Sequence, residues 1–166
     1  MIIRSFFHAV VLGLFAGMGA SSAHSEDDGD QLLIRQSQWH SARAASQDGK
    51  SVVRDSSGRT QGTITQSGNR ITFRDSSGRL TGTATVSGNT TTFRDSSGRS
   101  AGTATNQQGK TTFRSSSGTS LGSAGQDLSK TTFRDASGRS LGTANGNGSR
   151  TTFRDSSGRS TGSVGR

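Results

Sequence analysis

An aromatic position recurs every twenty residues through the C-terminal part of the chain. β-Branched residues precede it, a polar stretch rich in Ser and Gly follows it, and a second β-rich stretch comes next. This order predicts a strand, a tight turn and a second strand in every unit. Six such units cover residues 51–166, and the recurring position is occupied by Val53, Phe73, Phe93, Phe113, Phe133 and Phe153.

Each turn ends in glycine and is flanked by an acid and a base. A three-residue loop ending in Gly is typical of a type I turn followed by a bulge, because Gly adopts the left-handed conformation at little cost. We therefore expect the acid and the base to face each other and to set the register. The unit that lacks the acid, at Ser115, also lacks the base, at Thr119, which indicates that the two interact. The pairs are Asp55 with Arg59, Asp75 with Arg79, Asp95 with Arg99, Asp135 with Arg139 and Asp155 with Arg159.

Extending this register predicts which residues face each other along each hairpin. Each Phe should lie opposite the residue eight positions on, for example Phe133 opposite Leu141 and Phe73 opposite Thr81. The connection between units, such as residues 67–69, is also rich in turn residues, and its loop length is open. Because one step of register moves a side chain to the other sheet face, the sequence leaves open whether successive Phe share a face.

The fold class is all-β, and we expect the hairpins to form an extended antiparallel meander, with one short N-terminal helix. In a meander, equivalent arginines of neighbouring units lie two strands, about 9.5 Å, apart. A β-solenoid with two strands per coil is the alternative, but it would stack these like charges at about 4.8 Å. Partial disorder is a further alternative, because only 26% of the residues are hydrophobic and Gly is abundant. Against disorder, the chain has no Pro, and its Thr, Phe and Gly recur in phase.

The first 23 residues have the features of a secretory signal peptide. A basic start is followed by an apolar stretch and by small residues at Ser21 and Ala23, which predicts cleavage after Ala23. The mature protein is therefore expected to be secreted or periplasmic, with no integral membrane span left after cleavage. The chain has no Cys, so disulfides cannot stabilise it.

Residues 24–50 differ from the repeats in charge and pattern. They carry five carboxylates against three basic residues, whereas the repeats carry sixteen basic residues against six Asp. Residues 31–46 predict one short helix, for which Asp30 is a plausible cap. We interpret this segment as a cap over the open edge of the first hairpin or as a linker; recognition of a partner is the alternative. Its apolar residues are Leu32, Leu33, Ile34, Trp39, Ala42, Ala44 and Ala45.

The sequence offers no constellation of catalytic residues. His8 lies in the leader, His24 and His40 are the other two histidines, and without Cys no zinc set can be assembled. No Ser is paired with a base and a third orienting group. Identical units are also a poor way to build one asymmetric site. We therefore expect a non-enzymatic protein that uses neither a cofactor nor a metal.

The repeats would present basic side chains at a fixed spacing. Alternation along a strand places the arginine after each Phe on the face opposite the Phe. Such a row suits a polyanion, for example a surface polysaccharide; keeping the strands soluble is the alternative role. Nucleic acid is the weaker candidate, because no aromatic side chains interleave with the arginines. The predicted row consists of Arg74, Arg94, Arg114, Arg134 and Arg154.

The string TTFRDSSGR resembles the aromatic-Asp-x-x-Gly-Arg hairpins of YD-type (Rhs-like) secreted repeat proteins. The matching positions are Phe93, Asp95, Gly98 and Arg99 and their equivalents, and they cover most of the mature chain. The resemblance implies β-hairpin repeats in extracellular or cell-surface material. Arg94 separates the aromatic residue from the Asp, whereas the YD pattern has them adjacent, so a large shell is not implied. The unit length and its strand-turn-strand plan are also similar to curli-type fibre subunits, although their Gln and Asn ladder is missing.

These features predict a secreted or periplasmic, non-enzymatic repeat protein that acts at the cell envelope or cell surface. It would bind a polyanion or a surface, or self-associate through open sheet edges. The alternative is an exported effector, with a role in virulence, whose repeats form a binding surface for a host protein.

Overall fold

The computed structural model describes residues 49–165, which form twelve β-strands. The predicted hairpins are confirmed, because each unit contributes two strands joined by a tight loop. The signal peptide and the helix predicted over residues 31–46 lie outside the described residues. Residues 49–165 include no helical segment long and apolar enough to cross a bilayer. The strands are β1 (Gly49–Asp55), β2 (Thr60–Ser67), β3 (Arg70–Asp75), β4 (Leu80–Ser87), β5 (Thr90–Asp95), β6 (Ser100–Gln107), β7 (Lys110–Arg114), β8 (Ser120–Asp127), β9 (Lys130–Asp135), β10 (Ser140–Asn147), β11 (Arg150–Asp155) and β12 (Ser160–Gly165).

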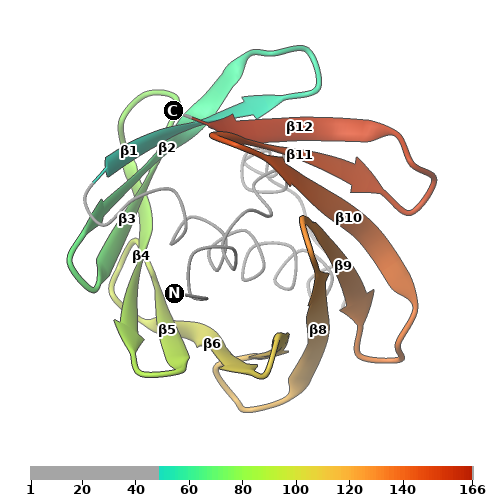
Figure 1. Ribbon diagram of the computed structural model, residues 1–166. Coiled ribbons are helices and arrows are strands. Elements are labelled where there is room, and N and C mark those ends of the chain that lie inside the picture. The colour runs from blue at the N-terminus through green and yellow to red at the C-terminus, as the bar shows by residue number, and fades with distance from the viewer. Residues whose placement is uncertain (1–48, 166) are drawn as a thin grey trace, which may run out of the picture.

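The strands close into a barrel (Figure 1). Each strand pairs with its neighbours in sequence, and β1 pairs with β12 through Val53 opposite Val164 and Arg54 opposite Ser163. The predicted meander is therefore closed rather than extended, and the solenoid is wrong because consecutive strands pair antiparallel. The physical reason for closure is that every repeat adds the same stagger and twist, so the sheet curves until its first and last strands meet.

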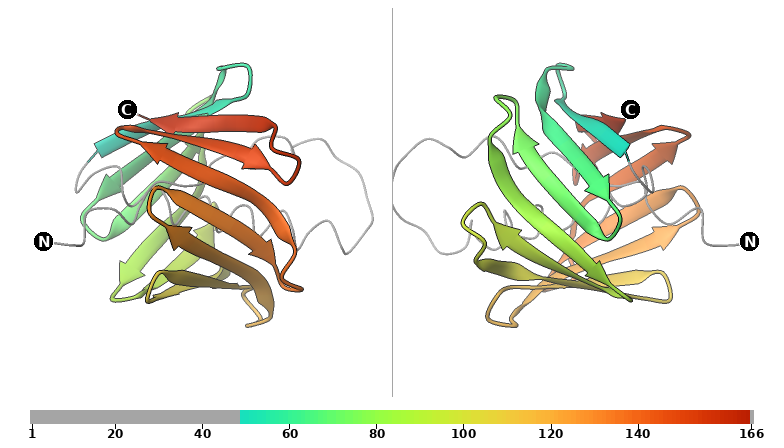
Figure 2. Two further views of the ribbon diagram at one scale, coloured as in Figure 1. Left: turned by 45° about the vertical axis from the view of Figure 1, so that its right-hand side comes forward. Right: turned by 90° about the vertical axis from the view of Figure 1, so that its left-hand side faces the viewer.

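The two mouths of the barrel, seen from the side in Figure 2, are built from different turns. At one mouth, which we call the arginine rim, a three-residue loop joins the two strands of each unit. In the first loop, Gly58 N–H donates to the Asp55 carbonyl and Asp55 N–H donates to the Arg59 carbonyl, both at 3.0 Å. Gly58 has a φ of +82°. This geometry is the predicted type I turn with a glycine bulge.

At the opposite mouth, which we call the terminal rim, two-residue turns join successive units. Ser67 pairs with Arg70 across the first of these turns. Gly68, its first central residue, has a φ of +56°, as a type II′ turn requires. β1 begins and β12 ends at this same mouth. The loop length that the sequence left open is therefore two residues.

One of the turns at the terminal rim has an unfavourable residue. Leu128 has a φ of +49° and its side chain is 87% exposed. We predict that Leu128→Gly raises the free energy of unfolding by about 0.5–1 kcal/mol, because Gly adopts positive φ without the Cβ penalty. Equilibrium unfolding in denaturant measures this change. Leu128→Ala, which keeps the Cβ atom, is the matched control and should alter stability little; a destabilised Gly variant would contradict the argument.

A β-bulge on the second strand of each hairpin shifts the expected register by one residue. The prediction that each Phe faces the residue eight positions on is therefore wrong. The bulge needs glycine: a Cβ atom at Gly142, where φ is +152°, would collide with the carbonyl oxygen of Arg154. Leu141 packs against the buried apolar cluster. The observed pairs are Phe133 with Gly142 and Phe73 with Gly82, in place of Leu141 and Thr81.

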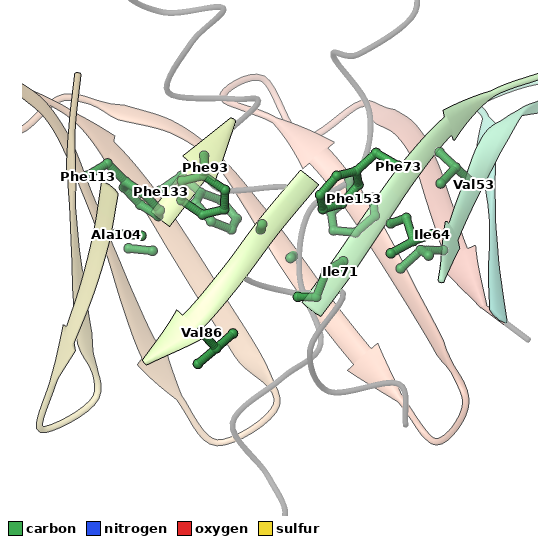
Figure 3. Close-up of a cluster of buried hydrophobic side chains, with 14 residues drawn as sticks. Val53, Ile64, Ile71, Phe73, Val86, Phe93, Ala104, Phe113, Phe133 and Phe153 are labelled. Atoms are coloured by element: carbon green, nitrogen blue, oxygen red, sulfur yellow. The ribbon is translucent and has the colours of Figure 1, made fainter. Parts of the chain in front are cut away.

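The five Phe of the repeats lie in the barrel interior together with Val53 (Figure 3). They form one layer, and each is at most 8% exposed. Small residues flank the rings on the neighbouring strands; Phe93, for example, pairs with Ala84 and Gly102. Successive Phe therefore share the inner face, and alternation directs the arginine after each Phe outward.

Candidate functional site

The arginine that follows each Phe lies on the outer face near the arginine rim and is exposed. The strand sets the direction in which the arginine side chain leaves the sheet, and a hydrogen bond to the loop sets the position of its guanidinium group. In every unit, guanidinium nitrogen Nη1 donates a hydrogen bond to the carbonyl oxygen of the loop glycine. The bonds are Arg54 to Gly58 (3.1 Å), Arg74 to Gly78 (2.8 Å), Arg94 to Gly98 (2.9 Å), Arg114 to Gly118 (2.9 Å), Arg134 to Gly138 (2.9 Å) and Arg154 to Gly158 (2.8 Å).

Closure of the barrel arranges these six arginines as a ring, which we call the arginine ring. Neighbouring members lie two strands apart, or about 9.6 Å along the sheet. The sequence prediction omitted Arg54, which joins the ring because β1 pairs with β12. Its spacing of four residues to the loop glycine is the signal that identifies it. The five predicted members are Arg74, Arg94, Arg114, Arg134 and Arg154.

The structure brings each predicted Asp–Arg pair together through the main chain of the arginine. Asp95 Oδ1 accepts hydrogen bonds from the N–H groups of Ser97 (2.8 Å) and Arg99 (2.9 Å). The carboxylate therefore holds the loop in shape, much as a backbone carbonyl would. The corresponding bonds from the arginine N–H are Arg59 to Asp55 (2.9 Å), Arg79 to Asp75 (2.9 Å), Arg139 to Asp135 (2.8 Å) and Arg159 to Asp155 (2.9 Å).

The unit without this Asp shows how little of the arrangement depends on charge. Ser115 Oγ accepts the N–H of Thr119 at 3.1 Å, and the loop keeps the hydrogen bond from Gly118 N–H to the Ser115 carbonyl. A hydroxyl thus supplies the acceptor that the other units take from a carboxylate. This unit has Ser115 and Thr119 in place of the Asp and the Arg, and its loop is still held by hydrogen bonds from main-chain N–H groups.

Hydrogen bonds lower the pKa values of four loop carboxylates, those of Asp55, Asp75, Asp135 and Asp155. The Ser77 hydroxyl is the largest cause of the lowered pKa of Asp75, desolvation opposes it, and the Arg79 N–H adds to it. Serine hydroxyls act in the same way on the pKa values of Asp135 and Asp155. For Asp55 the Arg59 N–H is the largest cause of the lowered pKa. Attraction to the nearby guanidinium is the smallest of the causes in all four.

These pKa values predict a loss of stability in acid. A carboxyl whose pKa is lowered by folding binds fewer protons in the native state than in the unfolded state, so stability rises with pH across the titration. The stabilisation should be complete above the unfolded pKa of about 4 and should disappear as pH falls through the lower native values. Denaturant midpoints measured from pH 7 to pH 2 test this expectation. A midpoint that stays constant down to pH 2 would contradict it.

Asparagine and aspartate substitutions supply the controls for this pH dependence. Changing Asp75, Asp135 and Asp155 to Asn keeps an oxygen acceptor in each loop and should flatten the acid limb of the stability profile. Ser115→Asp should steepen the same limb, because it introduces a titrating carboxyl where a serine hydroxyl now accepts the Thr119 N–H.

A second set of cations lies on the outer face at the terminal rim. These residues are exposed and lie near the opposite ends of the same strands. Arg150 Nη2 donates to Ser163 Oγ at 3.0 Å, which ties one of them to β12. The set provides an internal comparison for the arginine ring, because it has similar charge but not the repeated bond to a loop glycine. It consists of Lys50, Arg70, Lys110, Lys130 and Arg150.

Residues 49–165 bring together no group of three or more His, Asp and Glu side chains that could hold a metal ion. His24 and His40 lie outside the described residues. The arginine rim presents guanidinium groups, which can donate charge-assisted hydrogen bonds to oxyanions.

Comparison of the chain with protein-family models, with curated protein sequences and with solved structures gives no match.

Proposed function

We propose that this protein is exported and binds an anionic polymer at the cell envelope or cell surface through the arginine ring. The observation that carries the proposal is the repeated bond from each guanidinium to its loop glycine, with donor–acceptor distances of 2.8–3.1 Å. Six exposed cations thus share one conformation and one spacing around the barrel.

This arrangement lowers the entropic cost of binding a charged chain. A free arginine side chain loses about 2 kcal/mol of rotamer entropy when it is immobilised. The bond to the glycine carbonyl orders Arg74, Arg94 and their equivalents before any ligand arrives. A guanidinium has five N–H donors, and its planar fork matches carboxylate, sulfate and phosphate groups. Ordered groups at a constant spacing favour a polymer with repeating anions over a single small anion.

The charge balance at the arginine rim also favours an anionic ligand. The loops add five further arginines against five aspartates, so the ring is not neutralised by neighbouring acids. Each of these aspartates accepts hydrogen bonds from loop N–H groups, as described above. The outer face of the rim therefore keeps an excess of positive charge.

Barrel closure weakens the case for self-association through sheet edges. The first strand, β1, pairs with the last strand, β12, so no edge of the sheet is free within residues 49–165. The Phe side chains, which could pack two sheets together, face the interior. The same inward placement leaves no aromatic residue among the arginines, which disfavours nucleic acid as the polyanion.

Binding of the protein to immobilised heparin, a sulfated polysaccharide, tests the proposal. Binding should be saturable and should weaken linearly in log–log form as salt rises, while uncharged dextran should not bind. Binding to neither polymer at low salt would contradict the proposal. Capture of a host protein that persists at high salt would favour the effector alternative instead.

A further inference from the structure

We propose that one barrel binds at least two polyanion chains at once, on different sides of the arginine ring, and so cross-links them, a role that rests on the function proposed above. The register of the strands decides whether the six arginines form a level ring or a spiral. Thr72 lies opposite Thr83, and Thr83 lies opposite Arg94. Arg94 corresponds to Arg74, which lies two residues beyond Thr72. Crossing from one unit to the next therefore shifts the register by two residues.

The same shift recurs between all neighbouring units, including the pair that closes the barrel. At the closure, Thr152 lies opposite Ser163, and Ser163 lies opposite Arg54. Because equal shifts bring the sheet back to its first strand, equivalent residues of all units stand at one height around the barrel. The six arginines therefore form a level ring, with no step where β1 meets β12.

The ring surrounds a wide barrel, so its members face different directions. A shift of two residues for every two strands corresponds to a strand tilt of about 35°, and strands spaced about 4.8 Å apart then enclose a backbone cylinder roughly 22 Å across. Six equivalent positions are about 60° apart around this cylinder. Figure 1 shows the hairpins that carry them on all sides of the barrel. The members on opposite sides are Arg54 and Arg114, Arg74 and Arg134, and Arg94 and Arg154.

A chain that stays straight can contact only part of this ring. With guanidinium groups about 6 Å outside the backbone cylinder, the ring has a radius of about 17 Å. A straight chain that contacts two neighbouring arginines lies at least about 8 Å from every other member, because the surface curves away from it. A hydrogen bond needs a distance of about 3 Å. Four arginines therefore stay available to other chains.

The charge of the arginine rim is spread evenly, so no side of the ring is favoured. In five units, the ring arginine and the loop arginine stand against one Asp, which leaves one positive charge per unit. The fourth unit has lost the Asp and the loop arginine together, at Ser115 and Thr119, and keeps the single charge of Arg114. Chains on opposite sides thus meet equal charge and guanidinium groups bonded in the same way. Since a long polyanion also holds several barrels, a network forms.

Light scattering during titration of long heparin into the full mature chain tests the proposal. Scattering should rise to a maximum and fall again in excess heparin, because most chains then carry at most one barrel. A short heparin fragment should cause no rise, and the mass of its complex should correspond to two or three fragments per barrel. Soluble complexes at every ratio of long heparin, or one short fragment per barrel, would overturn the proposal and leave the proposed function intact. Absence of heparin binding would overturn both.

Two variants that remove equal charge distinguish bridging by the ring from general charge neutralisation. Changing the neighbours Arg134, Arg154 and Arg54 to Gln keeps one side of the ring intact. This variant should bind one short fragment and show no scattering maximum. Changing the alternate members Arg54, Arg94 and Arg134 to Gln leaves no two neighbours. This second variant should bind the fragment about fivefold more weakly than the first at physiological salt, since each chain loses one ring contact.

Both variants should keep the β-sheet circular dichroism of the unaltered chain, because the changed side chains are exposed. Equal affinity for the fragment and equal scattering in the two variants would overturn the proposal, because neighbouring arginines would then not act as the unit of binding.

Discussion

Replacing Arg74, Arg94, Arg134 and Arg154 with Gln should weaken binding to heparin at least about tenfold at physiological salt. Each of these side chains is ordered by its bond to a loop glycine, so each removed guanidinium takes away a cation that is already placed for contact. The slope of log K against log salt should fall by about three, since each ion contact contributes roughly 0.7–0.9. Titration of the polymer at several salt concentrations gives both quantities.

The terminal rim supplies the control with equal charge. Changing Arg70, Lys110, Lys130 and Arg150 to Gln removes four positive charges from the same outer face but leaves the arginine ring intact. This variant should lose only the small, non-specific part of the binding. If the two variants lose affinity equally, net charge and not the ring is responsible, and the proposed site is wrong. Circular dichroism and unfolding midpoints must show that both variants keep the barrel.

The local features of the fold could be predicted from sequence because their causes lie within a few residues. Gly98 follows two serines between Asp95 and Arg99, and this order alone favours a type I turn with a bulge. The bonds from loop N–H groups to Asp95 are the same kind of local contact. The sequence analysis gave too much weight to attraction between the Asp and Arg side chains. An exposed carboxylate is better satisfied by the ordered main-chain N–H groups beside it.

The second bulge, which lies on the second strand of each hairpin before Gly142 and its equivalents, and the closure could not be predicted because they depend on the whole sheet. On β10 this bulge inserts Leu141, which has no partner residue on β9. No local sequence preference fixes the position of the inserted residue. The glycine after it is invariant in all units, which is the signal that was available. Closure depends on stagger accumulated over six hairpins, while each strand pair looks the same in an open or a closed sheet. The structure places the five arginines of the predicted row, exposed, at one rim, but the ring shape and the place of Arg54 could be seen only in the closed barrel.

A proline in β12 should distinguish the closed barrel from an open meander. We expect Ser163→Pro to lower the free energy of unfolding by about 3 kcal/mol or more relative to Ser163→Ala. In antiparallel pairs, hydrogen-bonded and non-bonded positions alternate. At the loop, Asp155 N–H donates to the Arg159 carbonyl. When the alternation is followed along β12 from this bond, the main-chain N–H and C=O groups of Ser163 point toward Arg54 on β1. In a closed barrel, Pro removes that bond, whereas in an open meander β12 is an edge and the same N–H faces solvent.

Ser123 on β8 supplies the matched comparison, because it holds the equivalent place in a strand that is interior in either architecture. It pairs with Arg134 on β9 as Ser163 pairs with Arg54 on β1. Ser123→Pro should therefore be as damaging as Ser163→Pro when each is compared with its own Ala variant. The Ala variants also account for the bond that Ser163 Oγ accepts from Arg150. If Ser163→Pro unfolds at nearly the same denaturant concentration as Ser163→Ala while Ser123→Pro is strongly destabilised, β12 is a free edge. In that case, the ring of arginines opens into a row.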